Sequence, residues 1–293
     1  MKRRAVCLAL TAAALPSPYV HAQTLKAPRR VGVLRHGNPE VGIANEQELI
    51  DVLTQSGFVV GRDVVVDARS AYGRAEDLPR LAADLAARKP DVIVARGPQG
   101  TRAVLAASAD IPVVAILGDF LASGTAATLA RPGGRVTGVN FQGTPLNAKR
   151  LELLAELLPK GSAVLNLGDP GTRSQPQVDA IAATARTLGL VSHTAHASTE
   201  LEIDAAFVSA RRLRVAGINV LGAPFLNSSR ARIITLAANA KLPVIYEWPI
   251  AVRDGGLMAY GPNLSAIDRK LAAYVVRILN GAKAGDLPIE QPT

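Results

Sequence analysis

The stretch DVIVARGPQGTRAVLAASADIPVVAIL, residues 91–117, decides the fold. It contains two short runs rich in valine and isoleucine, residues 92–95 and 113–117, on either side of an alanine-rich segment, residues 99–108. Near-continuous apolar runs of this length are typical of strands that are buried on both faces of a parallel sheet. The alanine-rich segment is long enough for a helix that connects two parallel strands. We therefore predict a doubly wound α/β fold.

The same alternation extends in both directions along the chain. Before and after this unit we predict strands at residues 31–34, 64–67 and 136–140, and helices at residues 46–55, 78–88 and 123–129. A long helix is predicted to start at Thr144-Pro145, with Thr144 as the N-cap and proline at the first helical position. A second series follows, with strands at 163–167, 190–193, 218–221 and 244–246 and helices at 177–188, 201–214, 229–240 and 264–279. The sequence thus predicts two doubly wound parallel-sheet lobes with a ligand cleft between them.

The N-terminus has the pattern of a secretory signal peptide. Lys2, Arg3 and Arg4 precede an apolar run at residues 5–15, and small residues lead to a cleavage site after Ala22. The apolar run is too short to span a bilayer. We expect residues 1–22 to be removed and the mature protein to be periplasmic.

Composition argues against several other classes of protein. The only cysteine, Cys7, lies inside the predicted signal peptide, so we expect no disulfide, no cysteine metal site and no lipid anchor. Loss of residues 1–22 removes three of the 33 Lys and Arg residues and none of the 24 Asp and Glu residues, which lowers the net charge from +9 to +6. The arginines are scattered and are not interleaved with aromatic residues. We therefore predict no binding of nucleic acid.

No pattern of residues indicates catalysis. The chain lacks a G-x-S-x-G elbow, a phosphate-binding loop that ends in Gly-Lys-Ser/Thr, and an H-E-x-x-H metal motif. His193 and His196 are three residues apart, which points them to opposite faces of a strand. We predict that the protein is not an enzyme and has no catalytic residue, metal or cofactor.

The residues that follow each predicted strand are the candidates for binding a ligand. In open parallel sheets, ligands bind beyond the carboxyl ends of the strands. An alternative stays open for each residue, because Gly, Pro, Asp and Asn at these places also simply form turns. The candidate ligand-binding residues are His36, Asn38, Gly97, Gln99, Gly100, Thr101, Asp119, Gln142, Asp169, Thr172, Phe225, Tyr246, Glu247 and Trp248.

Several motifs resemble a known family. They are Arg131-Pro132-Gly133-Gly134, Lys149-Arg150-Leu151-Glu152, Gly255-Gly256-Leu257-Met258-Ala259-Tyr260-Gly261-Pro262 and Asp286-Leu287-Pro288-Ile289-Glu290-Gln291-Pro292-Thr293. In this order they resemble the ABC transporter substrate-binding protein family that includes tryptophan- and tyrosine-binding members. The resemblance implies a type I periplasmic-binding fold and a monomer that delivers a small solute to the membrane permease of an ABC importer. A periplasmic sensor that feeds a membrane receptor or kinase stays open as the alternative.

The resemblance also implies a division of the chain. Lobe 1 would hold residues 29–141 and 261–293, and lobe 2 residues 142–260. Family members continue past the Gln-Pro-Thr motif with a strand and a helix of lobe 2, so lobe 2 of this chain is expected to lack them. Two departures leave the ligand class open. Asp119 is followed by Phe120-Leu121 where many members have Pro-Val, and the chain has Leu167-Gly168-Asp169-Pro170-Gly171 where many members have Asn-Pro-Ala-Asn-Pro.

One hypothesis assigns roles to the candidate residues. Residues 97–101 open a helix, whose backbone N–H groups and dipole favour an anion, with Gln99 and Thr101 as further donors. This segment would grip a carboxylate, as the resemblance to amino-acid-binding members implies, and Asp169 or Glu247 would pair with an ammonium group. Phe225, Tyr246 or Trp248 would pack on the solute. The alternative is that Thr101 merely caps the helix.

Overall fold

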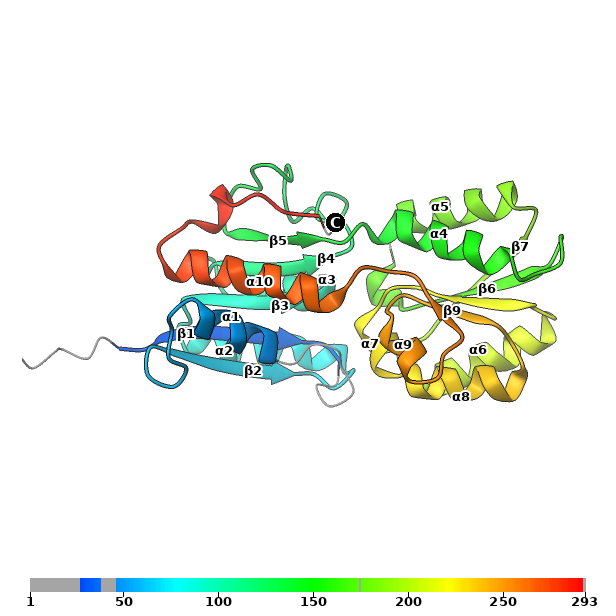
Figure 1. The fold of residues 1–293 in the computed structure, drawn as a ribbon, viewed down its shortest axis with the longest axis horizontal. Coiled ribbons are helices and arrows are strands. Elements are labelled where there is room, and N and C mark those ends of the chain that lie inside the picture. Colours follow the sequence, from blue (N-terminus) through cyan, green and yellow to red (C-terminus); the bar gives the residue numbers. More distant parts are fainter. Residues whose placement is uncertain (1–26, 38–45, 174, 292–293) are drawn as a thin grey trace, which may run out of the picture.

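The structure is a computed structural model that describes residues 27–37, 46–173 and 175–291. The predicted signal peptide at residues 1–22 and the candidate residue Asn38 lie outside this described part. Within it, the chain forms two α/β lobes that lie end to end, each built on a five-stranded parallel sheet (Figure 1). The predicted fold class is confirmed.

Lobe 1 is the lobe that contains the sheet β2-β1-β3-β4-β5. Its strands are β1 (Arg29–Arg35), β2 (Val64–Ser70), β3 (Val92–Arg96), β4 (Val113–Leu117) and β5 (Val136–Asn140). One face of the sheet is covered by α1 (Gln47–Gln55) and α10 (Leu264–Leu279), and the other by α2 (Leu78–Ala87) and α3 (Gly97–Ala107). The C-terminal helix α10 therefore returns to the lobe in which the chain begins (Figure 1).

Lobe 2 is the lobe that contains the sheet β10-β9-β8-β6-β7. Its strands are β6 (Ala163–Gly168), β7 (Val191–His196), β8 (Gly217–Val220), β9 (Val244–Tyr246) and β10 (Met258–Ala259). The helices α4 (Gly143–Ala155) and α5 (Gln175–Thr187) cover one face, and α6 (Glu200–Arg212) and α8 (Arg230–Ala240) the other. Short helices α7 (Pro224–Ser228) and α9 (Ile250–Arg253) follow β8 and β9. Counted from its own first strand, lobe 2 has the same strand order as lobe 1.

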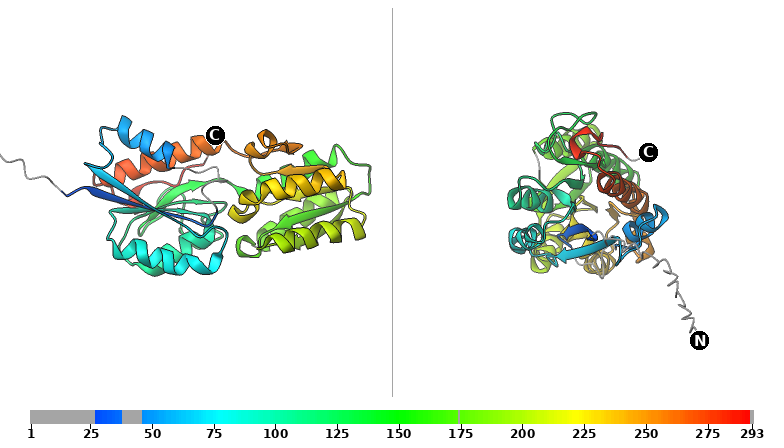
Figure 2. Two further views of the ribbon diagram at one scale, coloured as in Figure 1. Left: turned by 90° about the horizontal axis from the view of Figure 1, so that it is seen from below. Right: turned by 90° about the vertical axis from the view of Figure 1, so that its left-hand side faces the viewer.

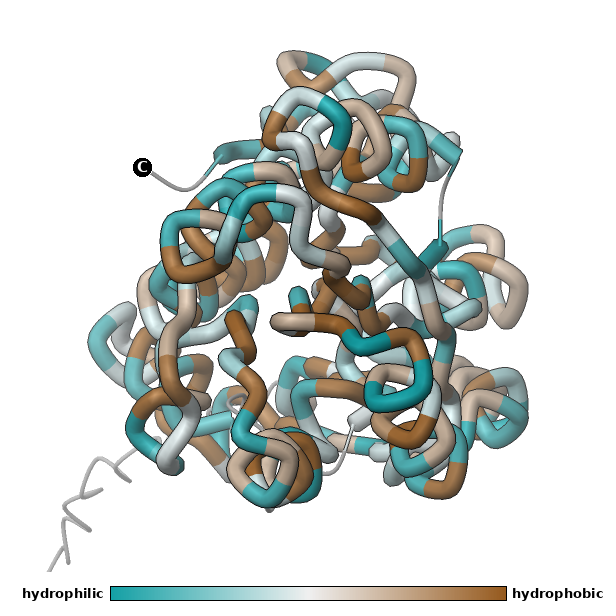
Figure 3. The backbone as a smooth tube through the Cα atoms, turned by 90° about the vertical axis from the view of Figure 1, so that its right-hand side faces the viewer, coloured by the Kyte–Doolittle hydropathy of each residue, from teal (hydrophilic) through white to brown (hydrophobic). Residues whose placement is uncertain are grey.

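Each sheet is buried between two layers of helices. On α10, Ile267, Leu271 and Val275 repeat every four residues and so form one stripe, which packs against Val31 and Val94 of the sheet. Full burial of each such aliphatic side chain contributes about 1.5–3 kcal/mol. The layers are seen from a second direction in Figure 2. Coloured by hydropathy, hydrophobic segments gather toward the middle of the molecule, while hydrophilic and hydrophobic stretches alternate along the outer coils (Figure 3).

The helix predicted at residues 123–129 is wrong. These residues form a series of turns instead. Gly124 has a φ of +68°, the Ser123 hydroxyl donates to the Phe120 carbonyl at 3.0 Å, and the Thr128 hydroxyl donates to the Arg131 carbonyl at 2.8 Å. Short hydroxyl side chains compete with the helical hydrogen bonds in this way, so composition alone overestimated the helix.

The predicted start of α4 is also wrong. The N-cap is Gln142, in the left-handed conformation with a φ of 54° and without a side-chain cap hydrogen bond, and the helix begins at Gly143. The Gly143 N–H donates to the Gly118 carbonyl at 3.0 Å, so a contact with lobe 1 takes the place of the Thr144 cap. The strand predicted at 190–193 extends to His196, and α7, α9 and β10 were not predicted because they are too short for a periodic pattern.

No helix in the described ranges is both long and apolar enough to cross a bilayer. The division at residues 141/142 and 260/261 and the lack of a further strand and helix in lobe 2 stay predictions.

Candidate functional site

A cavity of about 370 Å³ lies between the two lobes. Its walls come from the loops after β1, β3 and β4 of lobe 1 and from the loops after β6, β8 and β9 of lobe 2. In both lobes it lies beside the point where the strand order reverses, between β1 and β3 and between β6 and β8, where ligands of open α/β sheets bind. Cavities of roughly 300–1,000 Å³ are usual for small-molecule sites.

Two arginines form part of the lobe 1 wall. Arg35 ends β1 and Arg96 ends β3, and both line the cavity. Arg35 pairs with Glu46, and Arg96 donates through Nη2 to Asp268 of α10. Burial, and then the nearby charge of Arg96, lower the pKa of Arg35, whereas burial raises the pKa of Asp268 against the opposing effect of Arg96. The lobe 1 wall thus presents one buried cation, Arg35, and one half-buried cation, Arg96.

An acidic side chain forms part of the lobe 2 wall. Glu247 follows β9, is only 5% exposed, and its Oε1 has no hydrogen-bond partner among the described residues. Burial raises the pKa of Glu247 to about 7, opposed by the charge of Arg150 and by a hydrogen bond with Trp248. A side chain at position 222 would overlap Glu247 Oε1, so Gly222 makes room for the carboxyl group. An unpartnered buried oxygen of this kind is expected to find a donor on a ligand.

The remaining wall is partly aromatic. The rings of Phe141 and Trp248 lie with their centroids 5.7 Å apart and tilted by 58°. Trp248 follows a strand of lobe 2 but packs in the core of lobe 1, beside Leu264 of α10. Apolar and aromatic surface next to a few charged groups is typical of a small-molecule site.

The lobes touch along one rim of the cavity. A Cβ added to Gly37 would overlap the Ser228 hydroxyl, and one added to Gly97 would lie 3.1 Å from Pro224 Cγ. Across the same rim, Arg102 Nη2 donates to the Gly171 carbonyl at 3.5 Å. These contacts join lobe 1 to lobe 2, so the cavity is narrowed on this side.

The structure brings six of the candidate residues together around this cavity. Among them, the His36 ring donates through Nε2 to the Gly73 carbonyl at 3.0 Å, because that carbonyl can only accept. His36 Nδ1 has no partner in the described part of the chain. Asp119 Oδ1 accepts from the backbone N–H groups of Leu121 and Ala122, at 2.9 and 3.0 Å. The six cavity-lining candidates are His36, Gly97, Asp119, Thr172, Glu247 and Trp248.

Residues 99–101 do not line this cavity. The Thr101 hydroxyl donates to the Gly97 carbonyl at 2.8 Å, and its side chain is buried inside lobe 1. Gly100 faces the Leu34 carbonyl, and Gln99 packs on Gly171 across the rim. The hydroxyl that was expected to grip a carboxylate is therefore committed to the backbone of its own helix.

Four further candidates lie elsewhere. Gln142 is an exposed N-cap, and Phe225 and Tyr246 are buried in the core of lobe 2. Asp169 accepts through Oδ1 from the Gly171 N–H at 2.7 Å and lines a separate cavity of about 130 Å³. Its Oδ2 has no partner among the described residues, and burial raises the pKa of this carboxyl.

The list of candidate residues leaves out several residues that line the cavity, notably Arg35, Arg96, Phe141 and Asn147. Arg35 and Arg96 could have been found, because each directly follows an apolar strand run. Asn147 lies within a helix, where helical periodicity gives no sign of which face meets the other lobe.

Comparison with known proteins identifies the family. A profile of the family described as ABC transporter substrate binding protein matches residues 42–293. The chain belongs to the ABC transporter substrate-binding protein family. Members of this family bind small-molecule solutes and work with ABC permeases. The family and the fold are those of substrate-binding proteins rather than of enzymes. A search of curated proteins found no match.

Solved structures of several other proteins share the fold. A conserved domain protein from Vibrio cholerae has a TM-score of 0.82 at 23% identity, and the ABC domain from Streptococcus pneumoniae in complex with L-Trp has a TM-score of 0.81 at 22% identity. Each match covers 90% of this chain and 89% of the other. A solute-binding protein from Agrobacterium vitis bound with α-D-tagatopyranose has a TM-score of 0.67 at 13% identity, over 90% of this chain and 92% of the other. At these identities the likeness shows the fold alone.

The described ranges contain no group of three His, Cys, Asp or Glu side chains that could hold a metal ion.

Proposed function

We propose that the protein is the periplasmic solute-binding component of an ABC importer and that it captures an amino acid or another small carboxylate between its lobes. The observation that carries this proposal is the cavity of about 370 Å³ with walls from both lobes. A solute held there contacts both sheets at once, so its binding favours closure of the lobes around it. The L-Trp bound by the Streptococcus pneumoniae relative supports an amino acid as the solute.

The wall residues support a solute with two kinds of polar group. Glu247 offers an unpartnered carboxyl oxygen, which suits an ammonium group or another donor. Trp248 and Phe141 offer aromatic surface for the organic part of the solute. Of the two acids predicted to pair with an ammonium group, Glu247 is the one in the cavity wall.

A thermal-shift screen of the purified protein against amino acids, other small carboxylates and sugars tests solute binding. A ligand that binds only the native state raises the melting temperature, by an amount that grows with its concentration over Kd. We expect at least one amino acid or carboxylate to raise Tm and to bind with one-to-one stoichiometry in calorimetry. Failure of the whole panel to change Tm would contradict the proposed function.

Two further experiments test transport and location. Cells that lack the gene should take up the identified solute more slowly, and unchanged uptake would argue for a sensor rather than an importer component. The intact mass of protein recovered from the periplasm should correspond to a chain that starts at or near Gln23. A mass that retains residues 1–22 would contradict the predicted cleavage.

A further inference from the structure

Arg35 and Arg96 stand side by side at the reversal point of the lobe 1 sheet. The register pairs Leu34 of β1 with Ala95 of β3, so the next residue on each strand is one of the two arginines. Neighbours in register on parallel strands project from the same face of a sheet. Both arginines line the large cavity and also a void of about 30 Å³ next to it. The arginine pair therefore separates the two spaces.

The acids that pair with these arginines are set back from the cavity. Glu46 and Asp268 line the small void but not the large cavity. Arg35 pairs with Glu46, and Arg96 donates through Nη2 to Asp268. A guanidinium group has five N–H donors in a rigid fork, more than one carboxylate accepts. Both acids therefore lie on the void side of the arginines, whereas both arginines also line the cavity.

The two neighbouring cations, one buried and one half-buried, repel each other. The Arg35 residue is only 7% exposed, and the Arg96 side chain is 17% exposed. Burial and the charge of Arg96 both lower the pKa of Arg35, so each effect disfavours its charged form. An anion in contact with both groups would relieve this repulsion. Guanidinium groups match the geometry of a carboxylate through paired N–H donors.

We propose that the Arg35 and Arg96 guanidinium groups bind the carboxylate of the solute and that Glu46 and Asp268 are positioning residues. This assignment rests on the proposed function and places the carboxylate on strand-end side chains rather than on the N-terminus of α3. It sets the orientation of the solute, with the carboxylate on lobe 1 and a donor group toward Glu247 on lobe 2.

The balance of charge around the cavity favours one negative charge over two. The basic side chains of the wall equal in number the acidic side chains of the wall and the void together, so a doubly charged phosphate would leave an excess of two negative charges and a carboxylate an excess of only one. A carboxylate adds a single charge. The groups compared are Arg35, Arg96, Arg102 and Arg173 against Asp119, Glu247, Glu46 and Asp268.

Matched solutes that differ only in charge test the ligand chemistry. Calorimetry compares L-phenylalanine with L-phenylalaninamide, and phenylacetate with phenylacetamide and benzylphosphonate, together with the best solute of the thermal-shift panel. We expect each carboxylate to bind at least about tenfold more tightly than its amide. A change of that size corresponds to the loss of one charge-assisted hydrogen bond. Tighter binding of benzylphosphonate than of phenylacetate would overturn the assignment to a carboxylate.

Three variants test the residues. Arg96→Gln should weaken carboxylate binding by about ten- to a hundredfold and leave amide binding nearly unchanged. Arg96→Lys keeps a charge opposite Asp268 but loses the fork, so it should retain the fold and lose part of the preference for carboxylate over amide. Arg30→Gln is the matched control, because Arg30 lies on the same strand β1 but pairs with Asp67 outside the cavity, and its affinities should equal those of the wild type.

The possible failures are distinguishable. If carboxylates and amides bind equally, or if Arg96→Gln weakens both to the same extent, the arginine pair has only a structural role and the inference is wrong, while solute binding stands. If sugars alone raise Tm, the carboxylate assignment fails and a different solute class replaces it. If no solute binds the wild-type protein, the inference and the proposed function fail together.

Discussion

Strand β1 carries arginines at both ends, and the surroundings of Arg30 and Arg35 differ. Arg30, near the start, has a 41% exposed side chain and donates to Asp67 of β2 at 2.9 Å. Arg35, at the end, has an 8% exposed side chain, pairs with Glu46 and stands beside Arg96. Both arginines have a carboxylate partner. The difference is that Arg30 is partly exposed to solvent near the start of the strand, whereas Arg35 lines the cavity between the lobes.

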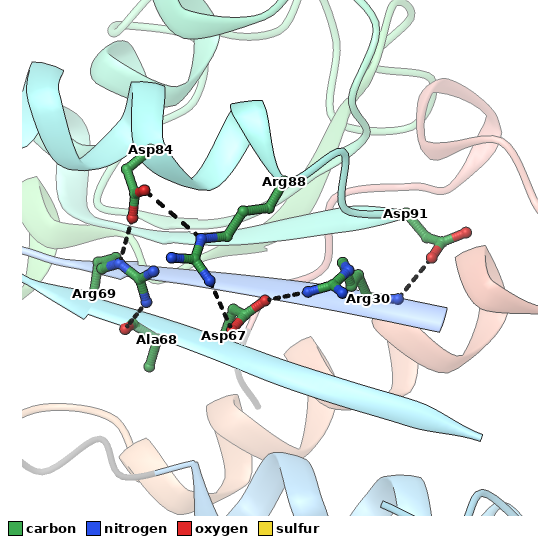
Figure 4. A network of polar contacts seen from close by, with 7 residues as sticks. All are labelled: Arg30, Asp67, Ala68, Arg69, Asp84, Arg88 and Asp91. Atoms are coloured by element: carbon green, nitrogen blue, oxygen red, sulfur yellow. Dashed lines mark hydrogen bonds and ion pairs between the residues drawn. The ribbon is translucent and has the colours of Figure 1, made fainter. Parts of the chain in front are cut away.

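Arg30 belongs to an extended network along β2 and α2, shown in Figure 4. Arg30, Asp67, Arg88, Asp84 and Arg69 alternate in charge along it. Water solvates and screens such groups, so exposed pairs contribute little to stability. The buried pairs at the cavity have lost that water, and removal of one partner leaves a charge without compensation. Burial of the paired groups, rather than the number of ion pairs, therefore decides how much stability is lost when one partner is removed.

The largest expected effect comes from breaking a buried pair. Arg96→Ala leaves the Asp268 carboxylate, 7% exposed, without its partner and should lower the free energy of unfolding by about 3–5 kcal/mol. Replacing both residues, as Arg96→Met with Asp268→Leu, should restore most of that stability but not solute binding. Urea unfolding at pH 7 measures both variants, and a loss below about 1 kcal/mol in Arg96→Ala would show that the pair is not effectively buried.

The next effect concerns pH and the buried acid across the cavity. Burial raises the pKa of Glu247 to about 7 from an ordinary value of 4.5. The pKa of Glu247 is higher in the folded protein than in the unfolded chain. The contribution of this carboxyl to stability is therefore fully present below about pH 4.5 and is lost as the pH rises to about 7. The loss is on the order of 3 kcal/mol.

Glu247→Gln removes this titration. The difference in free energy of unfolding between wild type and variant should therefore decline steadily over that pH window, as followed by urea unfolding at several pH values without solute. Parallel pH profiles for the two proteins would show that Glu247 is solvated.

The smallest effect is expected from the exposed network. Arg30→Gln should change the free energy of unfolding by less than about 1 kcal/mol, and the change should shrink further at high salt. Thermal unfolding at low and high ionic strength measures it. If Arg30→Gln lowered the free energy of unfolding as much as Arg96→Ala does, the proposed difference between Arg30 and the arginines at the cavity would be wrong.

Much of the fold followed from local pattern. The strands at residues 113–117 and 136–140 and the helix at 264–279 match the structure at both ends, because continuous apolar runs and a helical stripe are properties of neighbouring residues. The helix predicted at 123–129 failed where Ser123 and Thr128 hydroxyls bond the backbone. The start of α4 failed because its first N–H meets Gly118 of the other lobe, which no local pattern records.

The binding site was predictable only in part, for the same reason. The sequence shows directly that His36, Gly97, Glu247 and Trp248 come after strands. Parallel strands bring their carboxyl ends to one edge of the sheet, which places these residues at that edge. Which of the residues after a strand faces the other lobe depends on register and on the packing of the lobes. The sequence by itself therefore determined the class of fold and the edge at which a ligand binds. Only the tertiary structure decided that the Thr101 hydroxyl is committed to the Gly97 carbonyl and that Arg35 and Arg96 stand together in the cavity wall, because contacts between distant segments depend on packing that neighbouring residues do not encode.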